Sequence, residues 1–249
     1  MLPGGGAVIR ELQERTARAL PAQHVEDAQG WWLRLAPGCS WWIGSVLPHG
    51  CGDLPRRVAG AERFYAGHGA VARFQISPGA CPDGLDALLA GRGYRRENAV
   101  SLRVAPTARV LDRTPVSGPD VDVVDQPSRD WFAAWHGVHG GDARAEWELL
   151  QRVQPAAGYA SATIGDQTIA VGRAVADTGW AGVFGMATLP AARGRGAGRA
   201  VLAALARWAA GQHAGDMYLQ VEQDNVAARR LYERAGFTEI CGYHYRTAR

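Results

Sequence analysis

The stretch that decides the fold runs from Thr188 to Arg199 and reads TLPAARGRGAGR. A strand-like apolar pattern ends where it begins, and an amphipathic helix pattern starts where it ends. Backbone N–H groups at the start of a helix attract anions, and the helix dipole adds to that attraction. Glycines let the backbone approach a phosphate group closely. Taken alone, a loop of glycine and arginine is more often an ordinary loop than a phosphate site.

A second string lies roughly 30 residues downstream, where Asn225 to Phe237 reads NVAARRLYERAGF. The order and spacing of the two strings, each preceded by a strand pattern, resemble the two signatures of the GNAT family of N-acetyltransferases. The resemblance covers residues 121–249. It implies an α/β (α+β) fold, in which helices flank a twisted mixed sheet, and an acetyl-CoA-dependent N-acetyltransferase activity.

The same resemblance implies where acetyl-CoA, the co-substrate, binds. The sheet would splay open between Val183–Thr188 and Met217–Glu222, and the pantetheine arm would pair with the strand backbone. Asn225 would cap its helix and reach the pantetheine, and Tyr232 would act as the catalytic residue at the thioester sulfur. The implied acetyl-CoA contacts are Met186, Ala187, Thr188, Arg193, Gly194, Arg195, Gly196, Ala197, Gly198, Arg199, Asn225 and Tyr232.

Around these strings, the periodicity of apolar residues predicts the remaining elements of the C-terminal half. Ser128 is expected to cap a helix through Trp131 and Trp135, and Gly236 to end the last helix. The other predicted elements are a strand at 121–125, a helix at 142–153, an antiparallel meander at 159–164, 168–175 and 180–188, a helix from the glycine loop to about Ala210, and strands at 217–222 and 243–246.

The residues from Ala105 to Asp120 contain three prolines and no apolar periodicity, which favours a linker. The predicted domains are therefore 1–108 and 121–249, joined by 109–120. The N-terminal half repeats the order of the other half, with helices at 54–68 and 83–92 and strands at 72–76 and 100–104. We interpret it as a degenerate copy, giving a tandem GNAT layout of the kind found in mycothiol synthase.

The N-terminal copy is expected to be inactive. Its loop, His49-Gly50-Cys51-Gly52-Asp53, has no arginine and places Asp53 where phosphate would bind. Leu89 stands in the place of Tyr232, and Pro78 and Pro82 interrupt the turn that Asn225 organises in the other half. Four tryptophans, expected on strands, either line an acceptor cleft or, as the simpler alternative, fill the core: Trp31, Trp32, Trp41 and Trp42.

The general base is not determined by the sequence. Some GNAT enzymes carry a glutamate in an L-E-V string on the fifth strand, whereas this chain has Gln220 there. Glu222 lies two residues further along the same strand face and is either a substitute base or a solvated charge. A water chain is another option, and the predicted helices at the acceptor side add four candidates: His136, His139, Asp142 and Glu146.

Composition limits the remaining possibilities. The formal charge of +3 does not favour nucleic-acid binding, and no apolar stretch is long enough for a membrane span. All 27 basic residues are arginine, so the enzyme has no lysine side chain to acetylate on itself. Four cysteines without a C-x-x-C pair predict no metal site, and a charged N-terminus favours a cytoplasmic protein.

The predicted function is direct transfer of acetyl from acetyl-CoA to an amine of a small molecule or peptide. The predicted assembly is a monomer or a homodimer. Two alternatives stay open at this point: a non-catalytic acyl-CoA sensor, and an acetyltransferase acting on protein N-termini or lysines.

Overall fold

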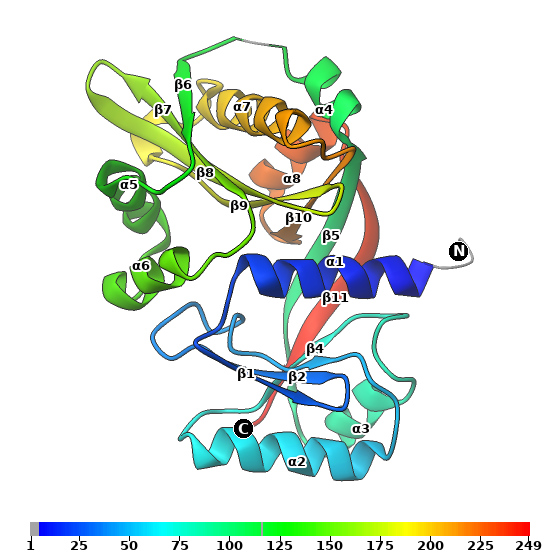
Figure 1. Ribbon diagram of the computed structural model, residues 1–249. Coiled ribbons are helices and arrows are strands. Elements are labelled where there is room, and N and C mark those ends of the chain that lie inside the picture. The colour runs from blue at the N-terminus through cyan, green and yellow to red at the C-terminus, as the bar shows by residue number, and fades with distance from the viewer. Residues whose placement is uncertain (1–4, 116) are drawn as a thin grey trace. The chain divides into compact units, whose positions relative to one another are not determined.

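The computed structural model describes residues 5–115 and 117–249 (Figure 1). Met1 to Gly4, and Val116 in the predicted linker, lie outside the described residues. The chain forms two compact units. Unit 1 contains residues 1–101, 222–224 and 240–249, and unit 2 contains residues 102–221 and 225–239. The predicted boundary at 109–120 stays a prediction.

Unit 2 is built on a mixed sheet in which the strand order is β10-β9-β8-β7-β6. The three central strands form the predicted antiparallel meander, while β10 runs parallel to β9. The turns fall at Gly165 and Gly179, as the sequence predicts. The strands are β6 (Asp120–Val124), β7 (Ala157–Ile164), β8 (Gln167–Asp177), β9 (Trp180–Thr188) and β10 (Asp216–Glu222).

Helices cover both faces of this sheet (Figure 1). One face carries α7 (Ala197–Gly211), and the other carries α5 (Arg129–His139) next to α6 (Ala143–Gln151). The predicted caps are confirmed, since Ser128 Oγ accepts from Trp131 N at 3.0 Å and Asn225 Oδ1 accepts from Ala228 N at 3.1 Å. Asn225 is the N-cap of α8 (Val226–Arg234). This helix ends before Gly236, which has a φ of 96°.

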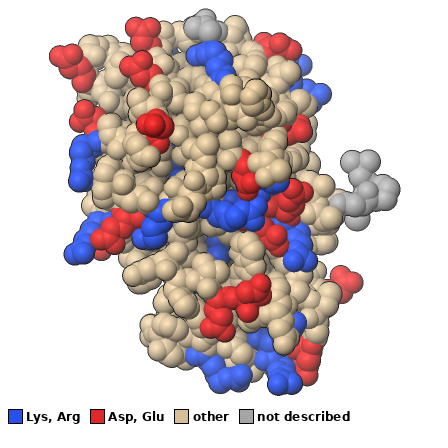
Figure 2. All heavy atoms as spheres, in the orientation of Figure 1, with Lys and Arg blue, Asp and Glu red and all other residues tan. Residues whose placement is uncertain are grey.

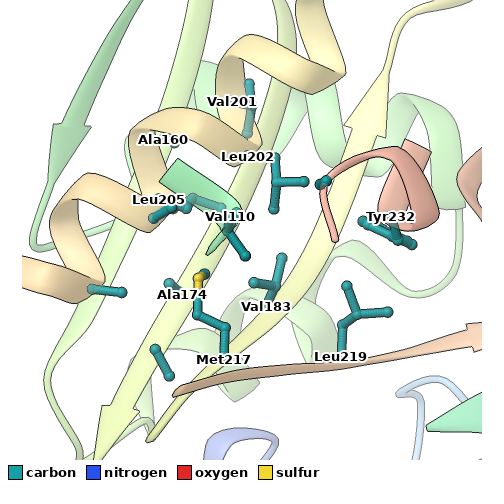
Figure 3. Packing of buried hydrophobic residues seen from close by; sticks show 14 of the residues in the cluster. Val110, Ala160, Ala174, Val183, Val201, Leu202, Leu205, Met217, Leu219 and Tyr232 are labelled. Carbon is teal, nitrogen blue, oxygen red and sulfur yellow. The ribbon is translucent and has the colours of Figure 1, made fainter. Parts of the chain in front are cut away.

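The core of unit 2 lies between the sheet and α7 (Figure 3). Small side chains on the strands let the helix approach closely, because a methyl group added at Gly172 would lie only 2.9 Å from Val201 Cγ1 and 3.2 Å from Leu205 Cδ1. Burial of this apolar surface, worth roughly 25 cal/mol per Å², is the main stabilising term for the unit.

Unit 1 has its own core around Trp31, Phe74 and Leu89, each at most 1% exposed. A three-stranded antiparallel sheet, β1-β2-β3, packs beside two helices. The last strand of the chain, β11 (Thr238–Thr247), pairs with β4 at residues 244–247. The elements are α1 (Gly5–Ala19), β1 (His24–Ala28), β2 (Trp31–Leu35), β3 (Leu47–Pro48), α2 (Leu54–Gly67), β4 (Arg73–Ile76) and α3 (Leu85–Gly91).

The structure differs from the sequence expectations at several points. β5 (Arg95–Pro106) is longer than predicted, and the predicted linker contains α4 (Thr107–Arg113). Val110 of that helix is fully buried in the core of unit 2, and this packing stabilises a helix that has no side-chain cap. Trp41 and Trp42 lie in a turn rather than on a strand, whereas Trp31 is on β2 and belongs to the core.

No helix in the described residues combines the length and the apolar character needed to cross a membrane. The described chain also brings no three His, Cys, Asp or Glu side chains together as a metal site would require. On the face shown in Figure 2, acidic and arginine side chains are interspersed rather than gathered by sign.

Candidate active site

The parallel pairing of β9 with β10 covers only part of both strands. It joins Trp180–Val183 to Asp216–Leu219, while β9 continues to Thr188 and β10 to Glu222. Beyond Val183, the edge of β9 that faces β10 therefore has its backbone groups available to another extended chain. This is the opening that the sequence predicts between these two strands.

A β-bulge interrupts β9 at the start of this opening. On the side of β8, Val171 pairs with Ala187 and Arg173 pairs with Phe184, so that two residues of β9 lie opposite Gly172 alone. Gly185, the first of the two, has a φ of 59°, a conformation that glycine adopts without strain. A bulge leaves its extra residue out of the ladder, and a backbone N–H released in this way can serve as a donor to an oxyanion.

At the bulge, α5 covers one face of the sheet. A methyl group added at Gly185 would lie 3.2 Å from Trp135 Nε1 and 3.6 Å from Trp131 Cη2, so this glycine lies under α5. Trp131 also donates from Nε1 to the carbonyl of Gly172 at 3.1 Å and fixes α5 over the bulge. Gly185 and Met186 are half-buried, so solvent reaches the bulge.

The glycine loop leads from β9 into α7 as predicted. Gly196 is the N-cap of α7 with a φ of 84°, and no side chain occupies the cap. Nothing lies within 4 Å of the Cβ positions of Gly194 or Gly196, so the start of the helix is open on that side. The loop therefore presents free backbone donors at a positive helix end, where a pyrophosphate fits.

The three arginines of the loop are engaged differently. Arg193 donates from Nε to the carbonyl of Thr188 at 3.2 Å. Arg199 donates to the carbonyl of Pro115 at 3.2 Å and to Ser117 Oγ. Arg195 is exposed and makes no hydrogen bond or ion pair within the described residues. Arg195 is thus the arginine whose guanidinium is fully available to a ligand.

Tyr232 is 6% exposed and belongs to the core of unit 2 (Figure 3). The centroid of its ring lies 6.0 Å from that of Phe237. Burial raises the pKa of its hydroxyl above the ordinary value of 10. The phenol is therefore protonated across the working pH range of an enzyme. It can donate a hydrogen bond, but it is a poorer acid than an exposed tyrosine.

The candidate bases differ in their exposure and in the hydrogen bonds that they make. Asp142 caps α6 by accepting from Arg144 N and Ala145 N at 2.9 and 3.0 Å. His136 Nε2 contacts the carbonyl of Gly141 at 3.1 Å, which requires a proton on that nitrogen. His139 is exposed and its ring lies 5.1 Å from that of Trp135.

The remaining two candidates are carboxylates with contrasting surroundings. Glu222 is exposed and accepts from Asn98 Nδ2 at 3.4 Å. Glu146 is 4% exposed and is the buried carboxylate of α6. Of the two carboxylates, only Glu146 is shielded from solvent.

Arg173 was not among the residues that the sequence analysis singled out. It is 2% exposed, and its guanidinium carbon lies 5.3 Å from the centre of the Phe184 ring. Burial lowers its pKa, an effect opposed by a hydrogen bond with Tyr159 and by the nearby Tyr218 and Glu146. A single arginine within the apolar run TIAVGRAVA was the available signal, because a charged residue is rarely buried in a strand without a role.

In the N-terminal half, Asp53, which the sequence analysis placed where phosphate would bind, caps a helix. Its Oδ1 accepts from Arg56 N at 3.1 Å and caps α2. Leu89 is fully buried. The Asp53 carboxylate therefore accepts from a backbone N–H at the start of α2. At the start of α7, where Gly196 is the N-cap, no side chain of the described residues fills this role.

Comparisons with known proteins identify the family of the chain. A family model described as "Probable histone acetyltransferase Rv0428c C-terminal" matches residues 6–246. The uncharacterized N-acetyltransferase YobR from Bacillus subtilis (strain 168) is 28% identical over 250 residues, covering 97% of this chain and 99% of its own length.

Two solved structures show the same fold at low identity. A GCN5-related N-acetyltransferase from Kribbella flavida is 18% identical with a TM-score of 0.73, covering 97% of this chain and 95% of its own. A tandem GNAT protein from the clavulanic acid biosynthesis pathway is 12% identical with a TM-score of 0.63, covering 78% and 69%. The predicted GNAT fold is confirmed, whereas the degenerate copy in the N-terminal half stays a prediction.

Proposed function

Because the chain belongs to the acetyltransferase family whose model matches residues 6–246, we propose that it transfers acetyl from acetyl-CoA directly to an amine at the opening between β9 and β10. The observation that carries this proposal is the end of the β9–β10 pairing at Val183 and Leu219, two residues before the bulge at Gly185. The opening offers an unpaired strand edge to a pantetheine arm and a displaced N–H to an oxyanion.

In this proposal the cofactor follows the route that the loop and strand define. The pantetheine amides pair with the backbone of Met186 and Thr188, and the pyrophosphate accepts from the N–H groups between Arg193 and Gly198. Arg195 adds a charge-assisted bond. The side-chain oxygen of Asn225 caps α8, and its amide N–H₂ is available to the pantetheine.

The chemical step joins the amine nitrogen to the thioester carbonyl carbon and breaks the carbon–sulfur bond. An amine with a pKa of about 10 is protonated at pH 7, which costs about 4 kcal/mol, so the proton must leave before attack. Glu146, buried on α6, is the candidate that its environment favours as the acceptor of this proton. The N–H groups at Met186 and Ala187 stabilise the oxyanion, and the Tyr232 hydroxyl donates to the departing sulfur.

The proposal is tested by measuring consumption of the acetyl-CoA thioester over a panel of small amines and peptides. Calorimetry with acetyl-CoA on the same protein gives the binding constant independently. Binding together with amine-dependent turnover supports the proposal. Binding without turnover for any amine would favour an acyl-CoA sensor, and no binding would reject the site.

The printed description of the family favours a second candidate, in which the acceptor is a histone or another protein. The panel therefore includes lysine-containing histone peptides. Since the chain has no lysine, an acetyl-lysine signal in mass spectrometry comes from the added peptide alone.

A further inference from the structure

A buried guanidinium lies beside the bulge, on the face of the sheet where the acceptor is expected. Arg173 pairs with Phe184 in the register of β8 and β9, and Gly172 next to it lies opposite the bulge. Since successive side chains of a strand point to opposite faces, Gly172 turns toward α7 and Arg173 toward α5 and α6. Its neighbours Tyr159 and Phe184 are on that same face.

This guanidinium has an unused donor. Arg173 is 2% exposed, and its Nη1 atom is buried without a hydrogen-bond partner among the described residues. Its polar surroundings are the hydroxyl of Tyr159, which bonds to it, and Tyr218 and Glu146, which act electrostatically. Native proteins pair nearly all buried charged donors with protein, water or ligand atoms, and beside the proposed site a bound substrate can supply the partner of Nη1.

Resting on the proposed function, we propose that the acceptor amine carries a carboxylate, as an amino acid or a peptide does, and that Arg173 Nη1 binds this carboxylate beside the bulge. Guanidinium N–H groups match a carboxylate in geometry and charge. The nearby Glu146 carboxylate repels a doubly charged group such as phosphate more strongly than a singly charged carboxylate. Because Nη1 is enclosed, binding requires the side chains that cover it to move aside.

This arrangement gives the acceptor an orientation. With the carboxylate held at Arg173, the amine of the same small molecule lies toward the half-buried bulge residues Gly185 and Met186. Glu146 then faces a substrate that brings its own ammonium group. Arg173 is thus a specificity-determining residue rather than a participant in bond making.

The test compares matched acceptors. Thioester consumption is measured for α-amino acids and dipeptides, for their amides, and for the corresponding amines without the carboxylate. The wild-type protein is expected to prefer the carboxylate members in kcat/KM. Arg173→Met is expected to lower kcat/KM for these members on the order of 10- to 100-fold, the usual effect of one charged hydrogen bond, and to leave the neutral members nearly unchanged.

Two further variants control the comparison. Arg207→Met removes an exposed arginine from α7 and is expected to keep the wild-type preference. Arg173→Lys retains the charge and is expected to recover part of the preference. Affinity for acetyl-CoA, measured by calorimetry, reports whether each variant is folded. The comparison of matched acceptors with the wild-type protein tests the inference even if a variant fails to fold.

The outcomes separate this inference from the proposed function. Equal turnover of carboxylate and neutral members by the wild-type protein would overturn the inference and leave the acetyltransferase intact. An equal loss for both members in Arg173→Met would also overturn it, since Arg173 would then be a structural residue. No turnover of any member would reject the proposed function itself.

Discussion

Val183 and Leu219 form the pair at which the parallel ladder between β9 and β10 ends. Two residues further along β9, Gly185 begins the bulge opposite Gly172. The loss of pairing and the distortion of the strand are thus neighbouring consequences of one local sequence, VFGMAT. Because glycine adopts a left-handed conformation without steric strain, Gly185 allows the strand to distort here with little loss of stability.

The anion site at the start of α7 is tested by two substitutions at one position. Gly196→Asp places a carboxylate at the open cap, and we expect acetyl-CoA affinity to fall by more than 10-fold because like charges meet there. Gly196→Asn has nearly the same shape and tolerates the same left-handed backbone, so it controls for strain. Calorimetry measures both, and equal affinities would contradict the assignment of the loop.

Tyr232→Phe is expected to lower kcat on the order of 10²-fold, with a smaller effect on the KM for acetyl-CoA. The ring keeps its contact with Phe237, so the fold should be maintained. Burial raises the pKa of Tyr232 above 10, so its hydroxyl remains a donor throughout the neutral and mildly alkaline range. Steady-state kinetics at several pH values provide the measurement, and full activity of the variant would reduce Tyr232 to a packing residue.

The elements that carry strong local signals could be predicted from the sequence. Ser128 and Asn225 cap their helices, and Gly196 and Gly236 take positive φ at helix ends. These features depend on single residues and on hydrogen bonds within a few positions of the chain. The order of the strands in the meander follows equally from short turns.

Other features depend on packing that the local sequence does not encode. α4 forms where a linker was expected, because Val110 is buried and Thr107 Oγ1 donates to the carbonyl of Ala214 at 2.6 Å. The bulge at Gly185 could not be distinguished from a simple strand glycine, since both leave the same pattern. The orphaned donor of Arg173 depends on neighbours from β7, β9, β10 and α6.

A carboxylate in unit 1 predicts a measurable pH dependence of stability. Arg246 donates to Asp86 at 2.7 and 3.3 Å and, with His244 at 2.9 Å, holds the pKa of Asp86 at about 2. A lowered folded-state pKa stabilises the fold fully above the unfolded value near 4 and loses that contribution as the pH falls toward 2. Because Asp86 is partly exposed, screening limits the contribution to roughly 1 kcal/mol.

Asp86→Asn is therefore expected to lower the free energy of unfolding at pH 7, and the difference from the wild-type protein should shrink between pH 4 and pH 2. Urea denaturation at each pH measures it. Asp83→Asn, in the loop before α3, is the matched control, since Asp83 is exposed and makes no hydrogen bond or ion pair within the described residues. A difference that persists unchanged at pH 2 would contradict the role of the carboxylate charge.

Two fragments test the predicted boundary at 109–120. The fragment 121–249 lacks Val110, which is fully buried in the core of unit 2, and the bond from Thr107 to Ala214. The fragment 102–249 keeps both, so we expect it to unfold at a higher temperature and more cooperatively than 121–249, as the removal of buried groups leaves a cavity. Thermal unfolding followed by circular dichroism compares them directly, and equal midpoints would support the boundary as predicted.

Each chain is expected to bind one acetyl-CoA. In unit 2 the cap of α7 is the open Gly196, whereas in unit 1 the cap of α2 is Asp53, whose carboxylate already accepts from Arg56 N at 3.1 Å. A pyrophosphate at α2 would have to displace that bond and face the same negative charge. The fully buried Leu89 also offers no hydroxyl to a sulfur. Native mass spectrometry with acetyl-CoA counts the bound molecules, and the Gly196→Asp variant should show a much smaller fraction of the single complex. Two equivalent complexes per chain would show that the N-terminal half binds the cofactor and is not a silent copy.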